Sequence, residues 1–277
     1  MTHILSLSYG KDSLACLEAC KILGYPIDHV IHAEIWATDT IQADLPPMVE
    51  FKEKADKIIK NRYGLTVEHV YAKDINGEKL SYDKYFYSSR NNKVYGRCIY
   101  GFPTLMGSWC VSRLKTGVIN KTLKTYSPTV TSASNVVQYL GIAADEHDRI
   151  VRHTKSGVVM PLVDIGWDEA HCRQWCEDND LLSPIYTNAT RGGCWFCHKQ
   201  NVSQLRVLRK NYPELWKLLL QWDLDSPVPF KPDGHTVHDY DRRFCLEDLG
   251  CIPKDKKFKW KMLEKIPASK EGNCNVL

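Results

Sequence analysis

The segment His3–Ser13, with the sequence HILSLSYGKDS, determines which fold this chain can adopt. Its first half, His3–Ser8, is a short apolar run of the kind that forms a buried strand. Small and apolar residues then recur at helical spacing as far as Leu23. The pattern therefore predicts a strand that leads directly into a helix, with a turn at Ser8–Ser13 between them.

The segments that follow repeat this alternation of strand and helix. Val30–Trp36 and Leu65–Tyr71 are predicted strands, and Pro47–Tyr63 is a predicted amphipathic helix between them. This β-α-β-α-β order is typical of an α/β fold with a parallel, Rossmann-like sheet and helices on both faces. The other predicted elements are a polar insertion at 72–101, helices at Trp109–Tyr126 and Trp167–Asp178, and a strand at Val136–Ile142.

The length of 277 residues exceeds the roughly 100–200 residues of one ordinary domain. From Val202 onward the pattern is mainly helical, and it ends in a basic stretch at Lys254–Lys261. We therefore expect a sheet domain at residues 1–200 and a helical C-terminal extension at residues 201–277. The basic tail either contacts nucleic acid or is a solvated surface.

The composition excludes several classes of protein. Hydrophobic residues make up 43% of the chain and charged residues 25%, as in an ordered globular protein. No apolar run approaches the roughly 18 residues that cross a bilayer, and the N-terminus lacks the features of a signal peptide. We expect a cytoplasmic protein with no membrane partner, and in that reducing compartment the eleven cysteines predict buried thiols or metal ligands. The net charge of +4 permits a polyanionic partner without requiring one.

The turn at Ser8–Ser13 has the residue types of a phosphate-binding loop. Gly10 allows the backbone to approach a phosphate, and the N-terminus of the following helix offers N–H groups and a positive dipole end. Lys11 adds positive charge, and the two serines add hydroxyl groups. The spacing differs from the Walker A motif, because no second glycine lies five residues upstream. The alternative is an ordinary turn between a strand and a helix.

A second motif, Cys194-Trp-Phe-Cys197, follows a pair of glycines. Such a turn directs two thiolates at one metal ion, and thiolates bind both zinc and iron–sulfur clusters. The spacing alone therefore does not distinguish the two. The cysteines predicted to pack in the core as small apolar residues are Cys16, Cys20, Cys172, Cys176, Cys245 and Cys251.

The segment Ser8–Ser13 resembles the PP-loop of the N-type ATP pyrophosphatases, in which a glycine is usual at the position of Tyr9. The resemblance implies that an adenine nucleotide binds here and that Lys11 and Asp12 act in catalysis. The residues that would bind the nucleotide are Ser8, Tyr9, Gly10, Lys11, Asp12 and Ser13.

The segment Cys110-Val-Ser-Arg113-Leu-Lys115, followed about eighty residues later by the C-x-x-C, narrows this resemblance. It is similar to the phosphoadenosine phosphosulfate (PAPS) reductase family, including its DNA-phosphorothioation relatives, whose cluster-bearing members hold a 4Fe–4S cluster. Those members have two adjacent cysteines where this chain has Trp109-Cys110, which makes Cys98 the nearest candidate for the fourth ligand. The implied ligands are Cys98, Cys110, Cys194 and Cys197, with Zn²⁺ as the alternative to a cluster.

Two further segments extend the resemblance. Asp39 and Thr40, after the second predicted strand, are similar to the family's Asp-Thr segment near the nucleotide, although an ordinary turn is the alternative. The segment from Gly141 to Arg149 resembles a Gly-x-Arg-x-x-Glu-Ser-x-x-Arg motif without its first arginine, and a solvated charged turn is the alternative. The candidate residues for phosphate or substrate contacts here are Gly141, Glu146, Arg149 and Arg152.

The resemblance implies a protein that binds ATP or PAPS with Mg²⁺ and that handles sulfur. In the favoured reaction of this sulfur transferase, ATP adenylates an oxygen of a nucleic acid or base and releases pyrophosphate. Sulfur from a donor protein then displaces AMP. The sequence is also compatible with a homo-oligomer.

Two alternatives to this reaction stay open. The first is a sulfonucleotide reductase that forms sulfite with a thiol reductant, for which the family uses a C-terminal Glu-Cys-Gly-x-His motif. That motif is absent, and Cys274 stands where it would fall, either as a catalytic nucleophile or as a tail thiol without a task. The second is a non-enzymatic, nucleotide-sensing subunit of a larger complex.

Overall fold

The computed structural model describes residues 1–92, 96–104, 108–126, 135–188, 192–254 and 257–266. The chain forms two compact units. The first comprises Met1–Asp83 and Cys110–Cys194, and the second comprises Lys84–Trp109 and Trp195–Leu277. Whereas the sequence suggests one boundary at residue 200, the second unit thus also takes in a segment from the middle of the chain.

The first unit contains a five-stranded sheet in which every pair of neighbouring strands is parallel, with the order β3-β2-β1-β6-β7. The strands are β1 (Thr2–Ser6), β2 (His29–Glu34), β3 (Val67–Tyr71), β6 (Val136–Leu140) and β7 (Val158–Val159). The predicted α/β fold with a parallel sheet is confirmed, and the topology is consistent with a Rossmann-like fold.

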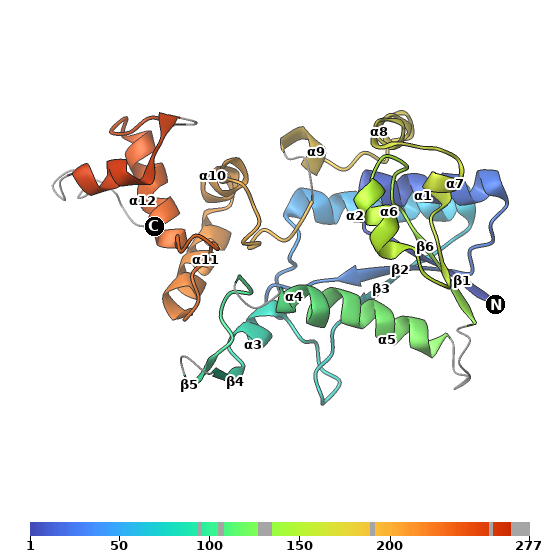
Figure 1. Ribbon diagram of the computed structural model, residues 1–277, viewed down its shortest axis with the longest axis horizontal. Coiled ribbons are helices and arrows are strands. Elements are labelled where there is room, and N and C mark those ends of the chain that lie inside the picture. The colour runs from blue at the N-terminus through green and yellow to red at the C-terminus, as the bar shows by residue number, and fades with distance from the viewer. Residues whose placement is uncertain (93–95, 105–107, 127–134, 189–191, 255–256, 267–277) are drawn as a thin grey trace. The chain divides into compact units, whose positions relative to one another are not determined.

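Helices cover both faces of this sheet (Figure 1). One face carries α1 (Lys11–Leu23), α2 (Pro46–Tyr63), α7 (Pro161–Asp164) and α8 (Glu169–Asp178), and the other carries α5 (Gly117–Thr125). Successive side chains of a strand point to opposite faces of the sheet, so each face presents apolar residues to helices. In β1, Leu5 packs among α1, α2 and α8, whereas Ile4 packs against α5. The short elements of this unit are α6 (His147–His153), α9 (Ile185–Asn188) and the π-helical turn η1 (Ser112–Thr116), which follows α4 (Trp109–Val111).

Four of the cysteines lie in the main core, as predicted. Cys16, Cys20, Cys172 and Cys176 are fully buried between α1 and α8. Burial raises the pKa of the Cys172 thiol above its ordinary range, and burial likewise raises that of Cys176 to about 12. Cys172 and Cys176 are therefore protonated at neutral pH and pack as apolar groups.

A glycine sets the distance between the end of β6 and the first turn of α1. A Cβ atom on Gly141 would lie 2.5 Å from the Cα of Ser13 and 2.6 Å from the carbonyl oxygen of Asp12. Real side chains do not tolerate such contacts with backbone atoms, so only glycine fits there. The loop after β6 consequently lies directly against the start of α1.

The second unit is mainly helical, as expected of the C-terminal region. It contains the antiparallel hairpin of β4 (Ser89–Asn92) and β5 (Gly96–Ile99), the end of α3 (Tyr82–Phe86), and the helices α10 (Val202–Asn211), α11 (Pro213–Asp225), α12 (Val237–Asp248) and η3 (Trp260–Lys265). Phe86 and Phe102 pack against aromatic residues of the C-terminal region. The ring centroids of Phe86 and Trp222 are stacked 5.9 Å apart, and those of Phe102 and Phe230 lie 5.1 Å apart edge-to-face. This packing assigns residues 84–109 to the second unit.

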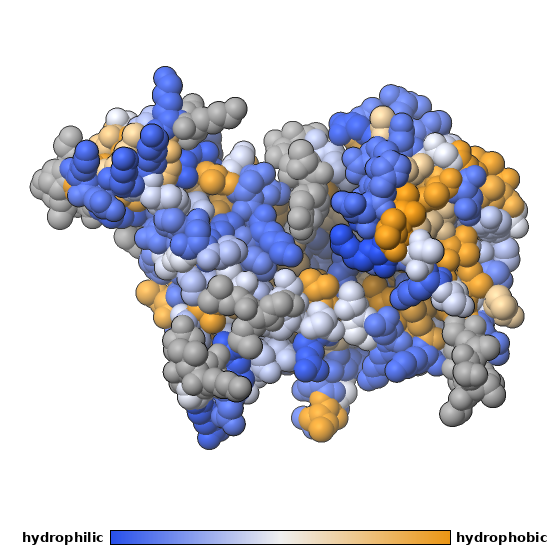
Figure 2. All heavy atoms as spheres, viewed as in Figure 1, coloured by the Kyte–Doolittle hydropathy of each residue, from blue (hydrophilic) through white to orange (hydrophobic). Residues whose placement is uncertain are grey.

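No helix within the described ranges is long and apolar enough to cross a membrane. The face shown in Figure 2 is largely hydrophilic, with smaller hydrophobic patches between the charged residues.

The close approach at Gly141 leads to a stability prediction. Gly141→Ala should lower the free energy of unfolding by about 1–3 kcal/mol, because the added methyl group forces the β6 loop away from α1. Urea denaturation measures this change. The matched control is Gly10→Ala, whose Cβ would meet its nearest atoms at ordinary distances of 3.4 and 3.5 Å and should leave stability nearly unchanged. Equal stability of the two variants would contradict this account of Gly141.

Candidate functional site

The loop Ser8–Ser13 is held in shape by hydrogen bonds among its own residues. The Ser8 backbone N–H donates to Ser13 Oγ at 3.1 Å, and the two serine hydroxyls lie 3.0 Å apart. Ser13 Oγ in turn donates to the carbonyl of Gly10 at 3.0 Å. These bonds close the turn between β1 and α1, and Gly10 occupies the N-cap position of the helix with no side-chain cap.

Tyr9 gives the loop its unusual backbone path. Its φ angle is +55°, in the left-handed region that normally favours glycine, and its side chain is fully buried. The phenol hydroxyl donates to Asp56 Oδ1 at 2.5 Å and lies 3.1 Å from His69 Nε2. Burial and the neighbouring Asp56 carboxylate raise the pKa of Tyr9, so the phenol stays protonated. The PP-loop that the sequence resembles usually has a glycine here. In this chain, Tyr9 instead anchors the loop to α2 and β3.

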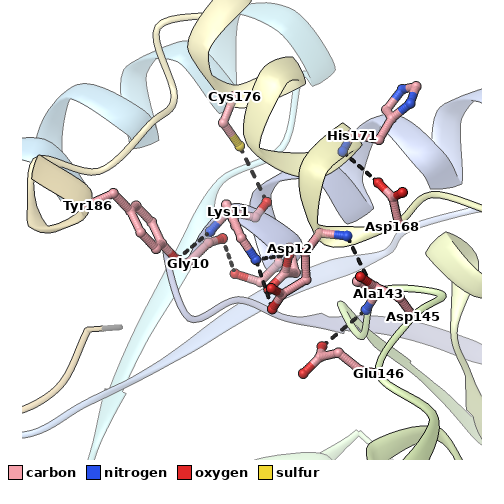
Figure 3. Close-up of polar contacts among 12 residues, drawn as sticks. Gly10, Lys11, Asp12, Ala143, Asp145, Glu146, Asp168, His171, Cys176 and Tyr186 are labelled. Carbon is pink, nitrogen blue, oxygen red and sulfur yellow. Dashed lines mark hydrogen bonds and ion pairs between the residues drawn. The ribbon is translucent and has the colours of Figure 1, made fainter. Parts of the chain in front are cut away.

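The first turn of α1 is held from the opposite side by α8 and α9 (Figure 3). The Lys11 backbone N–H donates to the hydroxyl of Tyr186 at 3.2 Å, and the Cys176 thiol donates to the Lys11 carbonyl at 3.3 Å. The backbone around Lys11 is therefore fixed before any ligand binds.

Three carboxylates gather at this helix end. Oxygen atoms of Asp12, Glu146 and Glu169 all lie within 4.8 Å of one another. Lys11 Nζ lies 2.8 Å from Asp12 Oδ1 and 3.1 Å from Glu169 Oε1. Burial raises the pKa of Asp12, the bond to Lys11 opposes that effect, and the charges of Glu146 and Glu169 add to it. Burial alone would lower the pKa of Lys11, but its bonds to Asp12 and Glu169 raise it, so the lysine is cationic.

Hydrogen bonds to backbone N–H groups hold Glu146 and Glu169, which are far from Lys11 in sequence, near the start of α1 (Figure 3). Asp168 caps α8 by accepting the His171 backbone N–H at 2.7 Å, and Asp145 accepts the Glu169 backbone N–H at 3.1 Å. Glu146 accepts the backbone N–H of Ala143 at 3.2 Å. The loop after β6 and the start of α8 are thereby held together next to Lys11.

A cavity of about 670 Å³ lies at the carboxyl ends of β1, β2 and β6, where open α/β sheets bind ligands. The predicted residues in its wall are Ser8, Gly10, Lys11, Asp12, Ser13, Gly141, Glu146, Arg149 and Cys194. The residues that the sequence did not single out include His32, Asp44, Lys115, Glu169 and Tyr186. The whole cavity lies within the first unit.

His32 is a buried residue of the cavity wall. It is 7% exposed, its Nδ1–H donates to the carbonyl of Leu7 at 2.9 Å, and its Nε2 is buried with no hydrogen-bond partner among the described residues. Burial, with the nearby positive charge of Lys52, lowers the pKa of His32 well below its ordinary value. The ring is therefore neutral.

Four of the predicted nucleotide-binding residues lie outside the cavity wall, and one of them is Tyr9, whose side chain is fully buried. Asp39 and Thr40 are exposed in a turn in which Thr38 Oγ1 accepts the backbone N–H of Thr40 at 3.3 Å, which is the ordinary turn that the sequence left open. Arg152 is exposed on α6. Arg149 lines the cavity, and its Nη1 bonds both oxygens of Glu146, at 2.7 and 2.5 Å.

The four predicted ligand cysteines divide between the units. Cys110 and Cys194 belong to the first unit, and Cys98 and Cys197 belong to the second. All four are half-buried, and Cys194 also lines the cavity. Their assignment to one metal centre stays a prediction. Cys274, the candidate nucleophile, lies outside the described residues.

The residues between the two cysteines of the C-x-x-C form its anchor. Trp195 is fully buried and Phe196 is 3% exposed, which leaves the flanking thiols nearer the surface. Within the second unit, Lys231 Nζ donates to the carbonyls of His198 at 2.6 Å and Gln200 at 2.5 Å. Burial lowers the pKa of Lys231. The two hydrogen bonds from Lys231 hold the backbone that follows the second cysteine of the motif.

Sequence patterns offered only limited signals for the missed residues. Lys115 stands in the Cys-x-x-Arg-x-Lys motif and could have been named from it. Glu169 follows an N-cap aspartate, and acidic residues are common in a first helical turn for reasons of stability alone. His32 and Tyr186 acquire their places only through the packing of distant elements.

The anchor of Tyr9 predicts a pH dependence of stability. Hydrogen bonds to Asp56 and Glu34 raise the pKa of His69 from its ordinary value of 6.5 to about 9. Protonated His69 therefore stabilises the fold fully below pH 6.5, and this contribution is lost as the pH rises through 9. The loss should be on the order of 1–3 kcal/mol, measured by urea denaturation at pH 6 and pH 9.5. His69→Gln should flatten this profile, and a variant profile as steep as that of the natural chain would contradict the assignment.

Comparison of the chain with protein-family models, curated proteins and solved structures gave no match.

Proposed function

We propose that the cavity at the carboxyl ends of β1, β2 and β6 binds the Mg²⁺ complex of ATP and that the protein is an ATP pyrophosphatase-type sulfur transferase. The observation that carries the proposal is the combination of the Ser8–Ser13 loop, the start of α1 after its N-cap residue Gly10, and Lys11 on one wall of a cavity of about 670 Å³. Such a helix start binds phosphate through its N–H groups and its dipole.

Gly10 supports a phosphate at this position. Its φ angle is −79°, and a Cβ atom there would make only ordinary contacts with its neighbours. The fold itself therefore does not require glycine at position 10. A side chain would instead occupy space in the cavity that Gly10 lines.

Asp12, Glu146 and Glu169 fit a divalent cation. Three carboxylates with oxygens within 4.8 Å of one another form an oxygen-only donor set, which Mg²⁺ prefers. When bound, Mg²⁺ would neutralise phosphate charge on the nucleotide. Lys11, which bonds Asp12 and Glu169, is close enough to transfer its contact to a phosphate oxygen.

The acidic wall favours ATP over a sulfonucleotide. Three carboxylates repel a phosphate or sulfate group unless a cation accompanies it, and ATP enters as its Mg²⁺ complex. Arg149, the retained arginine of the sulfonucleotide-like segment, is paired with Glu146. The wall therefore fits a polyphosphate that arrives with its own cation.

The proposed reaction has two displacements. An oxygen of the acceptor attacks the α-phosphorus of ATP, the bond to the bridging oxygen of the β-phosphate breaks, and pyrophosphate leaves with the electron pair. A sulfide-level nucleophile from the sulfur donor then attacks the acceptor carbon, and AMP leaves with the oxygen. The loop and Lys11 hold the phosphates.

The proposed 4Fe–4S cluster has Cys98, Cys110, Cys194 and Cys197 as its ligands. Thiolates bind soft iron well, and all four cysteines are half-buried rather than packed in the core. Cys194 lines the nucleotide cavity, so one proposed ligand also borders the site of ATP chemistry. A cluster there would supply or relay sulfur or electrons.

Lys11→Ala should weaken Mg²⁺–ATP binding by about tenfold or more, because the variant loses the cation that contacts the phosphates. Isothermal titration calorimetry measures the affinity. The matched control is Lys21→Ala, in the last turn of the same helix with a 59% exposed side chain, which should bind ATP normally. The natural chain, given ATP, sulfide and candidate acceptors, should form AMP and pyrophosphate. Unchanged affinity in Lys11→Ala, or sulfite formed from PAPS and a thiol, would overturn the proposal.

Protein purified without oxygen should be brown and contain four irons and four sulfides per chain. Cys197→Ser should lose most of this iron, whereas Cys251→Ser, which changes a half-buried cysteine of the same unit, should keep it. Visible absorption spectra and chemical analysis of iron and sulfide measure the cluster content of each variant. A colourless natural chain with one zinc ion would instead support a structural zinc site.

A further inference from the structure

A second cavity, of about 620 Å³, lies in the first unit along the open edge of the sheet. Its wall consists of the end of β3 and the loop after it, from His69 to Lys73, facing residues of η1 and α5. β3 is the outermost strand and pairs only with β2 among the described strands. The nucleotide chemistry proposed above makes no use of this groove.

The groove is positively charged. Lys73, Arg113 and Lys121 line it, and no lining residue is a carboxylate. Lys73 and Lys121 form no ion pair with any residue that the structure describes. His69 adds little to this charge, because Asp56 and Glu34 face it and balance its proton. Three cations along a groove without an acid match a series of phosphates.

The groove also offers an aromatic surface. Tyr71 is 38% exposed, and Lys73 Nζ lies 5.7 Å from the centre of its ring. The threonines of the opposite wall are already engaged, because the hydroxyl of Thr122 donates to the carbonyl of Val118 and that of Thr125 donates to the carbonyl of Thr122. A nucleic-acid strand uses both the aromatic ring and the cations, since its bases stack on aromatic rings and its phosphates contact lysine and arginine. An acidic peptide would use the charges but not the exposed ring.

Two elements connect the groove to the nucleotide cavity. The π-helical turn η1 places Arg113 in the wall of the groove and Lys115 in the wall of the nucleotide cavity, while Leu114 between them is buried. A Cβ on Gly117 would lie 2.4 Å from the carbonyl oxygen of Ser112, so this π-turn requires glycine at that position. His69 lines the groove and lies 3.1 Å from the hydroxyl of Tyr9 in the phosphate loop.

We propose that this groove binds the sugar–phosphate backbone of a single-stranded nucleic acid, with Lys73, Arg113 and Lys121 on phosphates and Tyr71 stacked on a base. The binding itself stands on the groove alone. Its role as the acceptor-binding surface for adenylation rests on the proposed function, because only that reaction requires an acceptor next to the ATP cavity.

The test is fluorescence anisotropy with labelled 20-nucleotide single-stranded RNA and DNA, measured over a range of salt concentrations. Lys73→Gln/Lys121→Gln should weaken binding about tenfold and should reduce the slope of log K against log salt by about 1.4, or about 0.7 per lost phosphate contact. Lys57→Gln/Lys210→Gln, which changes two other exposed lysines, removes the same net charge and should change neither value. Tyr71→Leu should weaken binding about fivefold or more with an unchanged slope, because it removes stacking and no charge.

Three results would overturn the groove as a nucleic-acid site. These are no binding by the natural chain, an equal loss in the groove variant and its charge-matched control, and displacement of the oligonucleotide by polyglutamate at equal charge concentration. ATP calorimetry on the same variants separates this proposal from the previous one. A groove variant that loses the oligonucleotide but binds ATP normally supports the groove. A natural chain that binds the oligonucleotide through the groove but not ATP refutes only the proposed function.

Discussion

The loop Ser8–Ser13 depends on the hydrogen bonds and ring contacts of the buried Tyr9 side chain. A non-glycine residue in the left-handed region costs on the order of 1–3 kcal/mol, and it persists only where the surroundings hold it. Here the hydroxyl donates to Asp56 of α2 and contacts His69 of β3, and the ring meets His32 of β2 edge-to-face at 4.7 Å. One side chain thereby ties the loop to three other elements. A glycine at this position would reach the same φ angle without strain but would provide none of these contacts.

Opposite charges are closely paired in the cavity at the carboxyl ends of β1, β2 and β6. Lys11 bonds Asp12 and Glu169, and Arg149 bonds Glu146, so these two cations neutralise part of a negative wall. Under the function that we propose, a ligand that brings only negative charge competes with the carboxylates for these cations. A ligand that arrives with a divalent cation satisfies both, because the cation takes the carboxylates and the lysine turns to the phosphate. The proposed site therefore favours a phosphate compound in its divalent-cation complex over the free anion.

Local patterns in the sequence were sufficient to predict the sheet, its principal helices and the turn at Ser8–Ser13 between β1 and α1. The apolar run before Ser8, and the helical spacing after it, have a period that one segment reveals by itself. Which segments make up the second unit was not predictable in this way, because Phe86 and Trp222 are far apart in sequence and meet only in the fold. The same holds for Glu169, whose place beside Lys11 depends on a hydrogen bond from its backbone to Asp145. Asp39 lies in an exposed turn, and its predicted contact with a nucleotide stays a prediction.

The discontinuous second unit has a consequence for how the chain is made. During synthesis, the segment Lys84–Trp109 leaves the ribosome before any of its partners in the C-terminal helices exists. At 5–20 residues per second, the roughly 120 residues that separate Phe102 from Trp222 correspond to an interval on the order of 10 s. During that interval Phe86 and Phe102, which are fully buried in the finished protein, have no helix to cover them. The sheet unit must therefore assemble around an unfinished apolar insert, and chaperone dependence should be greatest at this stage of translation.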